Sequence, residues 1–209
     1  MRDVFATPKP FISDLVNEIS ANSFSGVNMW VLCVLRSESR STTFLCRDWE
    51  PTTSDVTPED ALAYAKFLDT LADAVHKVDA ILTVDIAHWG AIWNFTALAG
   101  TSVDHFMTMG TYTDDSVAWK KYVNNAVSTF SREQLVVGKS CVCTAADSHY
   151  IYKGRMSAGL ETTKASNGQP YSVKELQQRF DYLASLGVHS VGLWKAPVPA
   201  TFWPLLHDM

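Results

Sequence analysis

The feature that most constrains the fold is a regular alternation, from residue 57 onward, of short apolar runs with longer segments of helical periodicity. The apolar runs that we predict to be strands cover residues 78–86, 102–109, 134–142 and 188–194. The segments that we predict to be helices cover residues 61–76, 92–100, 116–130 and 172–186. Parallel strands need a long crossover, usually a helix, so the alternation predicts an α/β fold with a parallel sheet and right-handed crossovers.

The first of these helices carries the clearest local signals. Thr57 is a favourable N-cap, Pro58 suits the first helical position, and two acidic residues follow in the first turn. Apolar side chains then recur at helical spacing: Leu62, Ala65, Leu68, Leu71, Ala72 and Val75. The same spacing predicts a helix upstream, at residues 10–21, and Gly187 is expected to end the last helix.

Composition and charge narrow the class of protein. With 209 residues, of which 47% are hydrophobic, the chain is long enough to bury a core and is expected to form one domain over residues 1–209. A net charge of -5 without a basic block argues against nucleic acid or an anionic membrane as a partner. No apolar run reaches the roughly 18 residues of a membrane helix. The four cysteines lack the spacing of a zinc site, so we expect neither a metal nor a cofactor.

Two carboxylates, Asp48 and Glu50, are separated by one residue in the segment that precedes these units. In a strand they would share one face, and at the carboxyl end of a parallel strand they would lie where α/β folds place their chemistry. The segment before them is irregular, with an apolar run at 30–35, a polar stretch at 36–43 and a second short run at 44–48. Taken literally this pattern predicts a hairpin, which does not fit the later alternation.

Residues 25–29 read SGVNM and residues 48–51 read DWEP. Joined directly they read SGVNMDWEP, which resembles the DGxDxDxE signature of glycoside hydrolase family 18, the chitinase-like TIM barrels. In the joined frame, four residues fall two apart and share one face: Gly26, Asn28, Asp48 and Glu50. Three later segments resemble the sixth, seventh and eighth strands of that family: 103–109, 135–138 and 191–194.

Two features depart from the family pattern. Residues 30–47, 18 in number, interrupt what should be one continuous strand. We interpret them as a translated intron or a rare insertion, and the alternative is a genuine loop or hairpin grown into the strand. Complete barrels close eight strands over about 250 residues, whereas only the units that correspond to strands four to eight are found. The resemblance therefore implies a partial (β/α)8 TIM barrel that is truncated at its N-terminus.

The resemblance implies retaining hydrolysis of chitin-like glycans, oligosaccharides or polysaccharides that contain N-acetylglucosamine, assisted by the acetamido group of the substrate. Glu50 would be the general acid that protonates the glycosidic oxygen, and Asp48 would hold the acetamido group. Trp194 would form the floor on which the sugar stacks, and Tyr112 is matched to the tyrosine of the sixth strand. The remaining substrate-binding candidates lie at strand ends or in the family's Met-x-Tyr pattern: Asn28, Asp85 and Met107.

Several alternatives stay open. Ser25 and Asn28 stand where the family has acids, and together with the incomplete barrel this favours a catalytically inactive carbohydrate-binding relative. A truncated or mis-spliced product without activity is a third interpretation. Asp85 and His88 could line the cleft, although a hydrogen-bonded histidine at a strand end is the commoner case. Residues 1–10 show no secretory signal, so the compartment stays open, with a secreted or lysosomal parent protein as an option.

Overall fold

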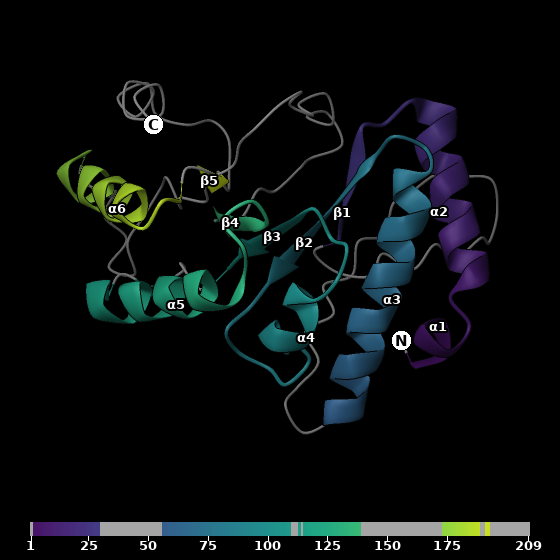
Figure 1. Ribbon diagram of the computed structural model, residues 1–209, viewed down its shortest axis with the longest axis horizontal. Helices are drawn as coiled ribbons and strands as arrows, with labels where there is room; N and C mark the ends of the chain where they lie inside the picture. The colour runs from purple at the N-terminus through teal and green to yellow at the C-terminus, as the bar shows by residue number, and fades with distance from the viewer. Residues whose placement is uncertain are drawn as a thin grey trace. The chain divides into compact units, whose positions relative to one another are not determined.

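Parallel strands, together with the helices that precede and connect them, make up most of the described part of the chain (Figure 1). This computed structural model describes residues 2–29, 56–109, 113, 115–138, 173–188 and 191–192. The helices are α1 (Arg2–Ala6), α2 (Lys9–Asn22), α3 (Pro58–His76), α4 (Phe95–Ala99), α5 (Ser116–Thr129) and α6 (Val173–Ser185). The strands are β1 (Gly26–Met29), β2 (Ile81–Ile86), β3 (His105–Thr108), β4 (Leu135–Gly138) and β5 (Val191–Gly192).

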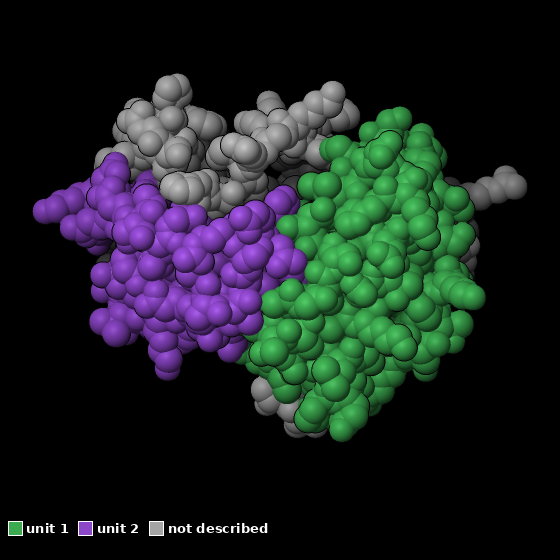
Figure 2. Space-filling view, in the orientation of Figure 1, with its two compact units in different colours: residues 1–85, 89–104 green, residues 86–88, 105–209 purple. Residues whose placement is uncertain are grey.

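The chain divides into two compact units, which Figure 2 colours separately. The first unit contains residues 1–85 and 89–104, and the second contains residues 86–88 and 105–209. In the first unit β1 pairs with β2 in parallel. In the second unit β3 pairs with β4, and β4 pairs with β5, again in parallel. The parallel pairing that the alternation predicts is therefore confirmed for these strands.

The core of the first unit is built from α3 and β2. Leu68, Leu71 and Val75 of α3 are fully buried, as are Leu82 and Val84 of β2. The prediction that Leu62 belongs to the buried face is wrong, because its side chain is 55% exposed. The buried face of the first turns is formed instead by Ala61, Tyr64 and Phe67.

The core of the second unit joins the last two long helices to the strands. Phe106 of β3 packs on Phe130, with ring centroids 4.7 Å apart. Helix α6 buries one side chain per turn, at Leu176, Phe180 and Leu183. The spacing of these three residues matches one face of a helix, so α6 lies as its sequence predicts.

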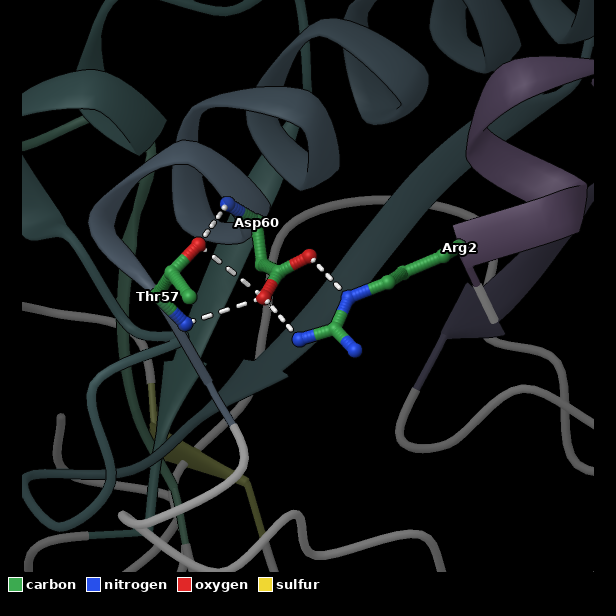
Figure 3. A network of polar contacts seen from close by, with 3 residues as sticks. All are labelled: Arg2, Thr57 and Asp60. Atoms are coloured by element: carbon green, nitrogen blue, oxygen red, sulfur yellow. Dashed lines mark hydrogen bonds and ion pairs between the residues drawn. The ribbon is translucent and has the colours of Figure 1, made fainter.

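Helix α3 begins with a capping box that also anchors the N-terminus of the chain (Figure 3). The Asp60 backbone N–H donates to Thr57 Oγ1 at 3.2 Å, and the Thr57 N–H donates to Asp60 Oδ2 at 2.9 Å. The Arg2 guanidinium of α1 donates to both Asp60 oxygens, at 2.7 and 2.6 Å. The hydrogen bonds from Arg2 hold the pKa of the Asp60 carboxyl well below its usual range. The predicted N-cap is confirmed, whereas α1 itself is not expected from the sequence.

Two helix ends differ in how well the sequence predicts them. Gly187 has a φ of 72°, in the left-handed region that ends helices, as predicted after α6. The prediction that a helix begins at residue 92 is wrong by three residues. Asn94 caps α4, since its side-chain oxygen accepts from the Ala97 N–H at 3.1 Å, and the helix begins at Phe95.

Among the described residues, no helix is long and apolar enough to cross a membrane.

We expect Thr57→Ala to lower the free energy of unfolding by about 1 kcal/mol, because the Asp60 N–H would lose its cap. Thr70→Ala is the matched control: Thr70 is an exposed residue of the same helix whose hydroxyl donates to the Lys66 carbonyl. Alanine has the higher helix propensity, so the control is expected to be neutral or slightly stabilising. Urea denaturation of both variants measures the difference, and equal effects would contradict a capping role for Thr57.

Candidate functional site

The carboxyl ends of β1 and β2 bring two of the predicted site residues together. The register sets Asn28 opposite Thr83, and Asp85 follows two residues later on the same face. Asn28 Nδ2 donates a hydrogen bond to Asp85 Oδ1 at 3.5 Å, which is longer than the usual N–H···O distance. The structure thus places two of the substrate-binding candidates side by side, and their role in binding stays a prediction.

Gly26 allows the two strands to approach each other. A Cβ atom at this position would lie 2.6 Å from the Ile81 Cγ1 atom and 2.7 Å from the Ile81 carbonyl oxygen. The second of these atoms belongs to the backbone and cannot move aside without shifting β2. The glycine at the start of the SGVNM segment therefore serves the strand pairing on which the position of Asn28 depends.

The two side chains differ in their exposure to solvent. Asn28 is exposed, whereas the Asp85 side chain is buried, with 7% exposed. Burial raises the pKa of the Asp85 carboxyl from 3.8 to about 7, and the hydrogen bond from Asn28 offsets part of this effect. Removing a carboxylate from water disfavours its charged form, so Asp85 holds its proton well above the pH at which an exposed aspartate loses it.

One aromatic residue of the first unit, Tyr64, lies close enough to Asp85 to sense its charge. Tyr64 of α3 is buried, and its ring packs edge-on against Trp93 with centroids 5.9 Å apart. Burial, and then the negative charge of Asp85, raise the pKa of the Tyr64 hydroxyl. Sequence reasoning missed Tyr64, because on an amphipathic helix it reads as an ordinary core residue. The position of Tyr64 near Asp85 depends on how α3 packs, and no signal in the sequence predicts it.

Two further candidates lie in the second unit. The His88 ring stacks on Tyr122 of α5, with centroids 3.7 Å apart and an interplanar angle of 25°. Burial lowers the pKa of the His88 imidazole, which favours its neutral form. Met107 lies on β3, where it pairs with Val136 and is half-buried. Among the described residues, no group of three or more His, Cys, Asp or Glu side chains is placed to hold a metal ion.

The other predicted residues lie outside the described part of the chain. These are the two acids of the motif, Asp48 and Glu50, together with Tyr112 and Trp194. The interrupting segment, 30–47, also lies outside it. Their roles therefore stay predictions.

Comparison with known proteins gives a likeness in structure alone. No protein-family model matches the chain, and no curated protein sequence matches it. A chitinase from Chromobacterium violaceum ATCC 12472 aligns with a TM-score of 0.59 at 14% identity, over 98% of this chain and 72% of the chitinase. The spore cortex-lytic enzyme SleL of Bacillus megaterium QM B1551 aligns with a TM-score of 0.61 at 13% identity, over 100% of this chain and 53% of SleL.

A class V chitinase from Pseudomonas fluorescens Pf-5 aligns with a TM-score of 0.56 at 15% identity, over 94% of this chain and 70% of that enzyme. The chain has a chitinase-like fold. It spans about half the length of SleL and about 70% of the length of the two chitinases. The resemblance read from the SGVNM and DWEP segments is thus confirmed at the level of the fold.

We expect Asp85→Asn to remove a pH dependence from the stability of the protein. Between pH 3.8 and about 7 the unfolded chain loses the Asp85 proton while the folded chain keeps it, so the free energy of unfolding falls as the pH rises. Each pKa unit corresponds to about 1.4 kcal/mol, so the loss is at most on the order of 4 kcal/mol and is complete above about pH 7. The asparagine stays neutral and avoids this loss.

Urea denaturation at a series of pH values measures this effect. Asp73→Asn is the control, since it removes an exposed carboxylate from the neighbouring helix α3. The difference in unfolding free energy between Asp85→Asn and wild type should grow in favour of the variant from pH 4 to pH 7. A difference that does not change with pH would show that Asp85 is ionised in the fold at low pH.

Proposed function

We propose that the protein is a glycoside hydrolase-like protein that acts on glycans containing N-acetylglucosamine. The observation that carries this proposal is the Asn28–Asp85 pair at the carboxyl ends of parallel strands, in a chain with a chitinase-like fold. In α/β barrels the carboxyl ends of the strands form the active-site face. The fold alone does not determine an activity, so the proposal depends on the residues at that face.

The proposed reaction is retaining hydrolysis assisted by the substrate. Glu50 donates its proton to the glycosidic oxygen as the bond to the anomeric carbon breaks. The acetamido oxygen of the same sugar bonds to the anomeric carbon, and water later opens this ring with retention of configuration. Asp48 holds the acetamido group, and its negative charge stabilises the positive charge that develops there.

The remaining predicted residues would bind the sugar. Trp194 supplies an apolar face for stacking, and Tyr112 and Met107 border the reacting sugar. In this proposal residues 1–209 form one domain that corresponds to strands four to eight of a TIM barrel. The parallel pairing of consecutive strands within each unit supports this assignment.

One sequence feature favours a second function, a carbohydrate-binding relative without activity. Ser25 and Asn28 are uncharged at positions where the family motif has acids. Loss of charge beside a general acid changes its pKa and therefore its efficiency. Asn28 can still donate and accept hydrogen bonds, so sugar binding would survive a loss of turnover.

We expect Glu50→Gln to reduce turnover of a chromogenic chito-oligosaccharide at least about 100-fold, because glutamine cannot donate the proton. Glu59→Gln, an exposed acid in the first turn of α3, is the control and should retain wild-type turnover. Circular dichroism and thermal unfolding would establish that both variants are folded.

Binding of the same oligosaccharide separates the two functions. Wild-type protein that binds without hydrolysis, together with unchanged binding by Glu50→Gln, would support the inactive relative. Wild-type protein that neither binds nor hydrolyses chito-oligosaccharides would contradict both functions.

A further inference from the structure

The Asn28 amide has two ends with opposite hydrogen-bonding character, and Asp85 contacts one of them. Asn28 Nδ2 donates to Asp85 Oδ1, so the Asn28 carbonyl oxygen lies at the other end of the amide group. An ionised carboxylate only accepts hydrogen bonds, so it pairs with the NH2 end of an amide and not with the carbonyl. Asp85 therefore selects the orientation of Asn28.

The side chains of Asn28 and Asp85 differ in exposure, so they can serve different roles. Asn28 is exposed and can reach a ligand, whereas Asp85 is 7% exposed and lies behind it. Thr83, on the same face, is engaged elsewhere, since its hydroxyl donates to the Val27 carbonyl at 3.4 Å. Among the described residues, Asp85 forms its side-chain hydrogen bond with Asn28. The titratable group that senses the charge of Asp85 is Tyr64, whose pKa is raised in part by that charge.

We propose that Asp85 is a positioning residue that turns the Asn28 carbonyl oxygen toward the bound glycan, where it accepts a hydrogen bond from an acetamido N–H or a hydroxyl group. This proposal rests on the proposed function and names the contact by which that site recognises its substrate. Strand β1 has an asparagine at position 28, where the family motif has an acid. In this proposal the neighbouring strand β2 supplies the carboxyl through Asp85, and Asn28 lies between that carboxyl and the ligand. Asp85 acts through Asn28 and does not touch the sugar.

Protonation of Asp85 changes what Asn28 presents. A protonated carboxyl can donate its hydrogen to the Asn28 carbonyl, so the amide can turn and present its NH2 group instead. The pKa of Asp85 near 7 places this change within the neutral range. Affinity for a donor group on the sugar is therefore expected to rise as the pH increases from about 5.5 to about 8.

A double-mutant cycle tests whether Asp85 acts through Asn28. The variants are Asp85→Leu, which has a similar size and no polar atoms, Asn28→Ala, and the two combined. Calorimetry with N-acetylated chitotriose at pH 8 should show about tenfold weaker binding for Asp85→Leu, which corresponds to one hydrogen bond. In the Asn28→Ala background the same change should have no further effect. An equal loss in both backgrounds would overturn the proposal, because it would indicate a merely structural role.

Two more variants sharpen the cycle. Asp85→Asn retains a carbonyl that can accept from Asn28, so its affinity at pH 8 should stay within about threefold of wild type, without the pH dependence. Asp104→Asn is the control at the amino end of β2, where the Asp104 carboxylate accepts from the Leu82 N–H at 2.8 Å. It should change stability and leave chitotriose affinity unchanged.

A measurement without sugar separates failure of this proposal from failure of the proposed function. The side-chain amide signals of Asn28, followed by NMR, should shift as the pH passes the pKa of Asp85 and should stop doing so in Asp85→Leu. If wild type fails to bind chitotriose but these shifts occur, the glycan is wrong and the orientation of Asn28 by Asp85 holds. If the shifts persist in Asp85→Leu, the orientation by Asp85 is refuted whatever the protein binds.

Discussion

The parallel register between β1 and β2 is the constraint on which the candidate site depends. It places Asn28 opposite Thr83 and so brings Asp85, two residues further on, to the same edge. Gly26 permits this register because any side chain there would meet the Ile81 backbone. The alternation of side chains then directs Leu82 and Val84 into the core and leaves the polar residues on the opposite face.

A buried carboxyl lowers the stability of the folded state, and an asparagine or a leucine at position 85 would avoid this loss. Asp85 keeps a pKa near 7 because burial disfavours its charge and the long hydrogen bond from Asn28 only partly compensates. Unfavourable groups of this kind often mark functional sites, although structural networks also produce them. Here the exposed Asn28 connects the carboxyl to the surface, at the carboxyl ends of parallel strands, where α/β barrels place their active sites.

The elements that the sequence predicts well are those with local signals. Helix α3 begins where Thr57, Pro58 and Asp60 indicate, and α6 is followed by Gly187 in the expected conformation. Helix α1 escapes prediction because its contacts are distant in sequence. Arg2 binds Asp60, and the Phe5 ring lies 5.6 Å from that of Tyr64. A five-residue helix has no intrinsic stability in water and forms here only through this packing.

The candidate site is predictable only in part, because the sequence carries local signals and the contacts within the site are distant in sequence. The apolar run at residues 78–86 predicts that Asp85 lies at a strand end, whereas the strand at Asn28 follows from the resemblance of SGVNM to the family motif. Their hydrogen bond follows from a register that no local signal specifies. The burial of Asp85 and its electrostatic coupling to Tyr64 depend on how α3 packs. A few short sequence segments indicate the chitinase-like fold, although the sequence identity to two solved chitinases is only 14% and 15%.

The proposed binding face lies at the carboxyl ends of β1 and β2, where we expect an N-acetylated glycan to bind. The most direct test is a crystal structure of Glu50→Gln, which should bind without turnover, in complex with a chito-oligosaccharide. We expect an N-acetylglucosamine residue with an N–H or hydroxyl group within hydrogen-bonding distance of Asn28 Oδ1, and Asp85 behind Asn28 without a sugar contact. A glycan bound on another face of the protein, with Asn28 left in contact with solvent, would contradict this location of the binding site.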